Sequence, residues 1–212
     1  MDQTMPEKID LKKQYKEFYN PSAKEPVILE IPAMQFLMVD GQGNPNTARS
    51  YQEAVEALYA VSYTVKFMMK KEHGLDYAVM PLEGLWWGTP LGQTRFSEAD
   101  KDRFQWTAMI MQPAFVTPAL IEEGIRRAAA KKPLPSAEKL RFEAFAEGLA
   151  VQIMYFGQYS DEGPTIERMH HYAFGQGYEL AGKHHEIYLG DPRRTAPEKL
   201  KTVLRNPLRP KG

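Results

Sequence analysis

The chain contains no cysteine among its 212 residues. This absence excludes disulfide bonds, thiolate metal ligands and a cysteine nucleophile. Net charge is also lacking, because 27 Lys and Arg residues balance 27 Asp and Glu residues. No electrostatic attraction toward nucleic acid or an anionic membrane is therefore expected. No uncharged apolar run approaches the roughly 18 residues that a membrane-spanning helix needs, and the charged first residues do not resemble a signal peptide. The composition predicts a soluble, cytoplasmic globular protein without nucleic-acid or membrane partners.

Common catalytic motifs are missing as well. The sequence has no Gly-Lys-Ser/Thr phosphate loop, no Gly-x-Ser-x-Gly and no His-Glu-x-x-His. Two histidine pairs occur, His170-His171 and His184-His185. A metal site would need one member of each pair and a carboxylate, whereas the alternative has His170 on a helix face and the others solvated. We predict neither a metal nor a cofactor.

The hydropathy pattern of the first half predicts a strand, a helix and two further strands. Ser50 and Glu53 have the spacing of a capping box that opens the helix, and Gly74 suits a left-handed cap at its end. The predicted strands span residues 27–31 with 36–39, 77–87 and 104–111.

A connecting helix is predicted to begin at Thr117-Pro118 and to run to about Lys132, because proline is favoured at the first helical position. The second half then repeats the order of the first, with a strand at 149–155, a helix at 164–174 and strands at 184–189 and 202–205. The element order predicts an α+β fold of duplicated strand–helix–strand–strand units, whose antiparallel sheets enclose a ligand pocket. Residues 1–26 are expected to form an N-terminal arm with a short helix at 10–19, and the repeats to span about 27–115 and 140–212.

Two glutamates stand inside otherwise apolar strands and are the strongest candidates for chemistry. Alternation places Glu83 on one side of its strand with Trp87, and Glu186 on one side of its strand with His184 and Tyr188. If both sides face one cavity, they form an aromatic box with negative charge at its base, which suits a flat, cationic ligand. Burial would also raise a glutamate pKa toward the range of a general acid or base. The alternative is that each glutamate faces solvent beside a surface Lys or Arg.

Aromatic side chains supply the remaining candidates. Trp86 and Trp87 are consecutive, so one of them must face away from the helices. Trp106 and Tyr155 lie in apolar strands, where packing in the core is the alternative to ligand contact, and a buried tyrosine hydroxyl needs a hydrogen-bond partner.

Four stretches together resemble the GyrI-like small-molecule-binding family in its stand-alone form. They are residues 19–26, 36–59, the Pro-Leu-Glu-Gly-Leu-Trp-Trp segment 81–87, and the His-His-Glu-Ile-Tyr-Leu-Gly-Asp-Pro-Arg-Arg segment 184–194. The resemblance implies a duplicated fold with a pocket between its halves. It also implies similarity to effector domains of multidrug-sensing transcription regulators, in which a buried glutamate receives cationic aromatic drugs, and Glu186 matches that glutamate. Some stand-alone members hydrolyse cyclopropane-bearing genotoxic compounds of the duocarmycin and yatakemycin type. We expect no helix-turn-helix ahead of the domain.

The resulting hypothesis is a detoxifying hydrolase. Glu186 would act as general base or orient water, and Tyr155 would assist through its hydroxyl. Trp87, Trp106 and Tyr188 would stack on the ligand, while Glu83 would set polarity or supply a second acid or base. The first alternative is a non-catalytic module that binds or senses lipophilic cationic aromatic compounds. The second is a partner-binding domain that inhibits another enzyme. The sequence leaves the natural ligand and the oligomeric state open.

Overall fold

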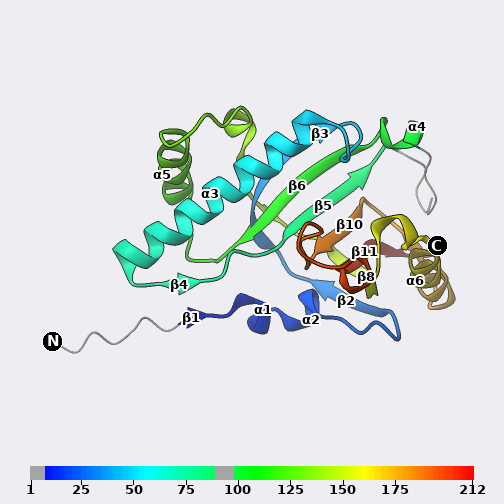
Figure 1. Cartoon of the computed structure of the whole chain (residues 1–212). Helices are drawn as coiled ribbons and strands as arrows, with labels where there is room; N and C mark the ends of the chain where they lie inside the picture. Colours follow the sequence, from blue (N-terminus) through cyan, green and yellow to red (C-terminus); the bar gives the residue numbers. More distant parts are fainter. Residues whose placement is uncertain (1–7, 89–97) are drawn as a thin grey trace.

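The computed structural model describes residues 8–88 and 98–212. Nine of the strands within these residues form one sheet, and helices pack on it (Figure 1). The hydrogen-bonded order is β2-β8-β11-β10-β5-β6-β3-β7, with β9 paired to β11, and every pairing in this sheet is antiparallel. Its strands span Val27–Ile31 (β2), Met34–Gln42 (β3), Leu82–Trp87 (β5), Gln105–Gln112 (β6), Arg141–Phe145 (β7), Gly148–Phe156 (β8), Tyr178–Leu180 (β9), His184–Tyr188 (β10) and Lys201–Pro210 (β11). The predicted α+β class is confirmed.

The duplication is visible in the strand order. The first unit is β3, helix α3 (Arg49–His73), β5 and β6, and the second is β8, helix α6 (Gly163–Gly175), β10 and β11. Each unit places its third strand between the other two, giving β3-β6-β5 and β8-β11-β10. The units meet through the antiparallel pair β5–β10, so what was predicted as two paired sheets is one continuous sheet.

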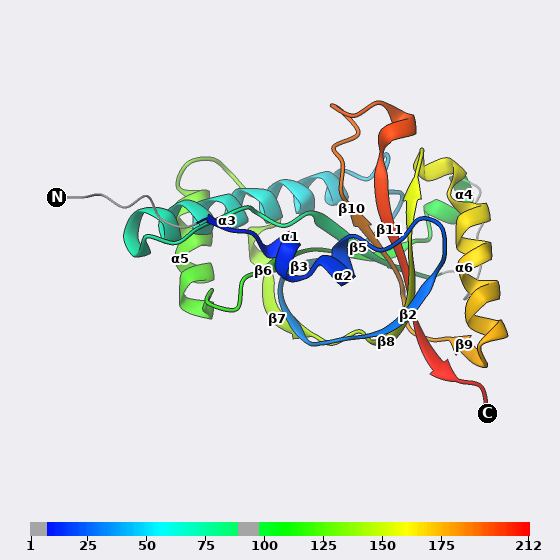
Figure 2. The same ribbon diagram turned by 90° about the horizontal axis from the view of Figure 1, so that it is seen from below.

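Helices α3 and α6 cover the same face of the sheet, one over each unit. Tyr51 of α3 contacts Trp86 and Trp106, which are register partners on β5 and β6. Ile166 of α6 packs with Ile153 of β8 and with other residues of the second core cluster. The two helices stand apart, one over each unit (Figure 2). A cavity lies between them, over β5 and β10.

The N-terminal segment covers the opposite face. Two short helices, α1 (Leu11–Gln14) and α2 (Lys16–Tyr19), replace the single helix predicted for residues 10–19. Leu11, Phe18 and Tyr19 are buried against the main core. Ahead of them, β1 (Lys8–Ile9) pairs in parallel with β4 (Asp76–Tyr77).

Helix ends test the capping predictions. Helix α3 begins at Arg49 after Ala48, which makes no side-chain cap, so the capping box predicted at Ser50 and Glu53 is wrong. Glu53 instead accepts a hydrogen bond of 2.7 Å from the Arg49 Nε atom one turn earlier. At the other end, Gly74 adopts φ 69°, and the predicted left-handed cap is confirmed.

The predicted start of the connecting helix is confirmed, because α5 (Pro118–Ala129) begins after Thr117, whose hydroxyl accepts from the Leu120 backbone N–H. Helix α5 packs along α3. The remaining short elements are helix α4 (Glu98–Lys101) and single 3₁₀ turns at Ala137–Lys139, Tyr159–Asp161 and Pro197–Lys199. Within residues 8–88 and 98–212, no helix combines the length and apolarity required to cross a membrane.

Candidate functional site

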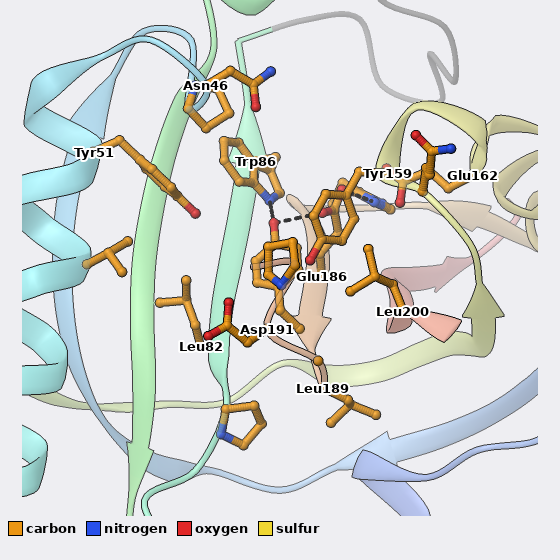
Figure 3. Close-up of a pocket in the computed structure, with 18 of the residues that line it drawn as sticks. Asn46, Tyr51, Leu82, Trp86, Tyr159, Glu162, Glu186, Leu189, Asp191 and Leu200 are labelled. Carbon is orange, nitrogen blue, oxygen red and sulfur yellow. Dashed lines mark hydrogen bonds and ion pairs between the residues drawn. The ribbon is translucent and has the colours of Figure 1, made fainter. Parts of the chain in front are cut away.

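An open cavity of about 2220 Å³ lies between α3 and the start of α6, over β5 and β10 (Figure 3). Its floor includes Trp86 of β5 together with Glu186 and Tyr188 of β10. Tyr51 stands on the α3 side and Glu162 on the α6 side. The outer part is lined by Leu189, Gly190, Asp191, Pro192, Arg193, Arg194, Pro197 and Leu200, which connect β10 to β11.

Glu186 is the centre of a hydrogen-bonded chain on this floor. The Trp86 Nε1–H donates to the Tyr188 hydroxyl at 3.0 Å, and that hydroxyl donates to Glu186 Oε2 at 2.7 Å. His184 Nε2 lies 3.3 Å from Glu186 Oε1. Burial disfavours charge on Glu186, but contacts from His184, Tyr188 and Glu162 outweigh it and lower its pKa. The site therefore holds an ionised carboxylate in a setting that is largely shielded from water.

His184 is held in place by an amide oxygen. Its Nδ1 atom lies 2.9 Å from Asn206 Oδ1, and His170 Nε2 lies 2.9 Å from the same oxygen. Since an amide oxygen only accepts, both ring nitrogens donate to it. The Nε2 atom of His184 is thereby aimed at Glu186. Among the residues that the structure describes, no cluster of three or more His, Asp or Glu is suited to a metal ion.

Glu162 completes the polar end of the cavity. It is the N-cap residue of α6, and its Oε2 atom is buried without a hydrogen-bond partner. Burial, and then the neighbouring charge of Glu186, raise the pKa of Glu162 well above its usual value. Two neighbouring carboxyl groups in a poorly hydrated site share one proton, because both cannot ionise at low cost. The opposite pKa shifts favour the proton on Glu162 and the charge on Glu186.

Aromatic rings surround these carboxyl groups. Tyr51 packs edge-on to Trp106 at 4.9 Å between ring centroids and lies 5.8 Å from Trp86. Tyr159 meets Tyr188 edge-on at 5.4 Å. Burial and the charge of Glu186 raise the pKa of Tyr159 to about 12, so its hydroxyl stays protonated. This inner part of the cavity is an aromatic box with the Glu186 carboxylate at its base.

The model of the GyrI-like small molecule binding domain family matches residues 24–209. The chain belongs to this family. The GyrI-like chain is 41% identical to a conserved protein from Listeria innocua, with 95% of this chain and 100% of that chain covered and a TM-score of 0.86. A protein from the same organism described as a hydrolase is 40% identical, with 95% and 100% covered and a TM-score of 0.82. The C-terminal domain of EcmrR shares the fold alone, at 10% identity, 88% and 98% coverage and a TM-score of 0.51. No match to a curated protein was found.

In this GyrI-like domain the two strand glutamates face opposite sides of the sheet. Glu83 pairs in register with Ile187, whereas Glu186 pairs with Gly84. Glu83 is fully buried, accepts a 2.6 Å hydrogen bond from the Tyr19 hydroxyl and lies 2.9 Å from His185 Nε2. The idea that both glutamates share one cavity is therefore wrong, and Glu83 belongs to a buried network beneath α2.

Some of the predicted aromatic residues line the cavity and others do not. Tyr188 stands on the cavity floor beside Glu186. Trp87 contributes to the cavity edge, where its Nε1–H donates to Gln105 and the Lys183 ammonium lies 3.4 Å from its ring centroid. Of the two consecutive tryptophans, Trp86 faces the helices, on the same side of the sheet as Tyr188. Trp86 was not among the predicted ligand-binding residues.

Trp106 and Tyr155 lie behind the cavity wall. Trp106 is buried in the main core beneath Tyr51, and it lines only a small cavity of about 190 Å³ beside β3. Tyr155 packs in the cluster under α6, where its hydroxyl donates to the Gln158 carbonyl at 2.9 Å. Glu162 was not predicted from the sequence. It stands in a polar stretch, where nothing in the pattern distinguishes it from a solvated carboxylate.

Proposed function

We propose that this GyrI-like domain binds a flat aromatic small molecule and hydrolyses an electrophilic cyclopropane ring within it. The observation that carries the proposal is the placement of Glu186 and Glu162 together in an aromatic cavity, with the pKa of Glu186 lowered and that of Glu162 raised. A carboxylate and a carboxylic acid side by side supply the base and the acid of a hydrolysis. The 40% identity to a Listeria innocua protein described as a hydrolase supports the same reaction class.

In the proposed reaction Glu186 orients a water molecule toward the ring methylene. The water oxygen forms a bond to that carbon as the strained carbon–carbon bond breaks. The released electron pair moves through the conjugated ring to its carbonyl oxygen, which becomes a phenolate. Glu186 takes a proton from the water, and Glu162 gives its proton to the phenolate oxygen. Ring strain drives the bond cleavage, so the protein needs only to orient the water and to stabilise the developing charge.

The hydroxyl role first expected of Tyr155 is assigned in this proposal to Tyr188. The Tyr188 hydroxyl donates to Glu186 at 2.7 Å and accepts from Trp86, so it fixes the direction of the carboxylate. The Trp86 indole and the Tyr159 ring are placed to contact the flat body of the ligand, and such aromatic contacts contribute about 0.5–1.5 kcal/mol each beyond area burial.

The decisive experiment is the isosteric substitution Glu186→Gln. It removes the base but keeps the shape, and we expect ring-opened product to form at least about 100-fold more slowly, because general base catalysis contributes 10² or more. Product is followed by liquid chromatography and mass spectrometry with an electrophilic spirocyclopropane substrate. The matched control is Glu143→Gln on the exposed edge strand β7, which should turn over normally. Normal turnover by the Glu186 variant would refute the proposal.

A second candidate function is binding or sensing of lipophilic cations without chemistry. The Glu186 carboxylate among aromatic rings favours it, since both features attract an organic cation. Tight binding of a cyclopropane substrate by the unmodified protein without ring-opened product selects this alternative.

A further inference from the structure

Asn206 of β11 borders the cavity and is not used by the proposed reaction. Only 2% of this residue is exposed, and the cavity lining also includes His184 of β10 and His170 of α6. The Asn206 side-chain oxygen meets both rings, since His184 Nδ1 and His170 Nε2 each lie 2.9 Å from Oδ1. One amide oxygen therefore links β10 and β11 to the helix that covers them.

The chemistry of an amide oxygen fixes which ring nitrogens carry protons. The oxygen has lone pairs and no hydrogen, so both histidines donate to it. Burial lowers the pKa of His170, so this ring is neutral at pH 7 with its single proton on Nε2. His184 keeps a proton on Nδ1 in the same way, and its other nitrogen, Nε2, is the one that faces Glu186.

The state of His184 Nε2 follows from its own surroundings. This atom is buried, and Glu186 Oε1 lies at ion-pair distance, 3.3 Å away. A ring with one proton would aim the lone pair of Nε2 at a carboxylate oxygen, and two acceptors at this distance repel. A second proton on Nε2 makes the same contact attractive, because the ring then carries a positive charge. Burial would raise the pKa of Glu186, yet this pKa is lowered, with His184 as the strongest of its stabilising contacts.

Other titratable groups near this pair take part in the same charge balance. They are Glu162 and His170 on the α6 side, Tyr159 in the turn before α6, Tyr188 on β10 and Tyr51 on α3. Burial, followed by the charge of Glu186, raises the pKa of Glu162 and of the three tyrosines, which favours their protonated forms. Glu186 is therefore the anion that His184 faces.

We propose that Asn206 is a positioning residue that holds His184 as a doubly protonated cation against Glu186. Oε1 of Glu186 then faces this cation, and Oε2 accepts from the Tyr188 hydroxyl at 2.7 Å, so both carboxylate oxygens are oriented. Asn206 acts on Glu186 through His184 and not by direct contact. The expected effect on turnover rests on the proposed function, whereas the state of the His184 ring does not.

The ring state is measured without any ligand, by long-range ¹H–¹⁵N correlation NMR of ¹⁵N-labelled protein at pH 7. A doubly protonated ring has two nitrogens with similar ¹⁵N shifts, whereas a neutral ring has one protonated and one bare nitrogen with widely separated shifts. The variant His184→Gln assigns the signal among the 5 histidines of the chain. We expect two protons on His184 in the unmodified protein. A neutral ring at this position overturns the proposal, whatever the variants do.

Asn206→Leu keeps the approximate size of the side chain and removes the acceptor. The variant should leave His184 with one proton at pH 7, on Nε2, because Glu186 remains as the acceptor there. The kcat for ring opening should fall about tenfold with KM changed less than twofold, since the aromatic contacts remain and only part of the general-base contribution is lost. Asn206→Asp restores an acceptor oxygen and should restore both the ring signal and turnover.

The matched control is His171→Gln, which removes the neighbouring histidine of α6. The His171 ring is exposed and its Nδ1 atom lies 2.8 Å from the Glu167 carbonyl oxygen, so neither readout should change. A doubly protonated His184 that persists in Asn206→Leu overturns the role of Asn206, as does Asn206→Asp that recovers neither the ring signal nor turnover. If Asn206→Leu fails to fold, the ring state of the unmodified protein decides. The expected ring signals without turnover in any of these proteins would support the positioning role and remove the proposed hydrolysis.

Discussion

At the residue scale, Gly84 decides how the floor of the cavity is built. It pairs with Glu186 across the β5–β10 junction and lies beneath the Trp86 indole. A Cβ atom at this position would stand 2.7 Å from Trp86 Nε1 and 2.9 Å from Trp86 Cε2. The absence of a side chain therefore lets the indole lie over the strand and reach the Tyr188 hydroxyl.

We expect Gly84→Ala to displace the Trp86 ring and to break its hydrogen bond to Tyr188. Ligand affinity should fall about tenfold, corresponding to about 1.4 kcal/mol, and intrinsic tryptophan fluorescence should shift. The matched control is Gly175→Ala in α6, where an added Cβ atom meets no atom within 4 Å; its affinity should be unchanged. A Gly84 variant that binds ligand as tightly as the unmodified protein would contradict this account of the floor.

The carboxyl pair predicts the pH dependence of turnover. Activity should fall at low pH when Glu186, whose pKa is lowered, becomes protonated. It should fall at high pH when Glu162, whose pKa is raised by burial and by Glu186, loses its proton. The substitution Glu162→Gln should lower kcat and remove the high-pH fall, because the glutamine does not titrate. A high-pH fall that persists unchanged in this variant would assign it to another group.

At the scale of elements, the sequence predicts strands and helices better than it predicts which strand faces meet. Alternation correctly groups Glu186 with His184 and Tyr188 on one side of β10. It does not fix the register of β5 against β10, and that register decides whether Glu83 faces the cavity. A shift of one residue would have moved Glu83 to the cavity and Gly84 away from it.

Elements were missed where the pattern is short. Strands β7 and β9 lie at the margins of the sheet, with few buried side chains, and a charged residue interrupts the apolar residues in each. The predicted strand at 77–87 begins only at Leu82 in the structure. Pro81, just before it, has no N–H for a strand ladder. Glu162 was missed for a different reason, since its environment is created by β10, which is distant in sequence.

One of the hydrogen bonds that hold α2 on the sheet comes from a buried hydroxyl and can be tested. The Tyr19 hydroxyl donates to Glu83 Oε1 at 2.6 Å. Tyr19→Phe removes this donor and leaves a carboxylate oxygen without it, which should lower the free energy of unfolding by about 1–3 kcal/mol. Urea unfolding followed by circular dichroism measures the change. Tyr63→Phe, at an exposed ring, is the control and should change stability by less than about 0.5 kcal/mol. Equal stability of both variants would show that this hydrogen bond does not hold α2.

At the scale of the whole molecule, one sheet separates two kinds of polar chemistry. The cavity face carries the carboxyl pair, and the opposite face carries a sealed cluster of Glu83, His185, Glu147 and Arg205, each with no more than 2% of its side chain exposed. Neighbours on β10 point into different sites: His185 into the cluster and Glu186 into the cavity. The cluster joins β5, β10 and β11 to the segment before β8, and the Arg205 guanidinium also donates to the Phe18 carbonyl at 2.8 Å. The cluster therefore holds the strands that carry the site together on the face opposite the cavity.

The sealed cluster sets the pH range over which the whole fold is stable. Burial opposes charge on Glu147, but His185 and Arg205 outweigh it and lower its pKa to about 2. Relative to an unfolded value near 4.3, this carboxylate contributes stability above about pH 4.3 that is lost as the pH falls toward 2. Burial also opposes charge on His185, yet Glu147 and Glu83 raise its pKa. Its contribution is complete below an unfolded value of about 6.5 and is lost as the pH rises through the higher folded value.

Unfolding free energy should therefore be greatest between about pH 4.5 and 6.5 and should decline on both sides. Urea unfolding at a series of pH values from 3 to 9 measures the profile. His185→Gln should lower stability at its maximum, because it removes the cation that contacts the buried Glu83, at a cost of about 3–5 kcal/mol. Glu147 keeps its contact with Arg205 in this variant. The substitution should also flatten the decline above pH 6.5, since glutamine does not titrate. A decline that remains as steep in the variant would mean that the alkaline loss of stability arises elsewhere than in the cluster behind the site.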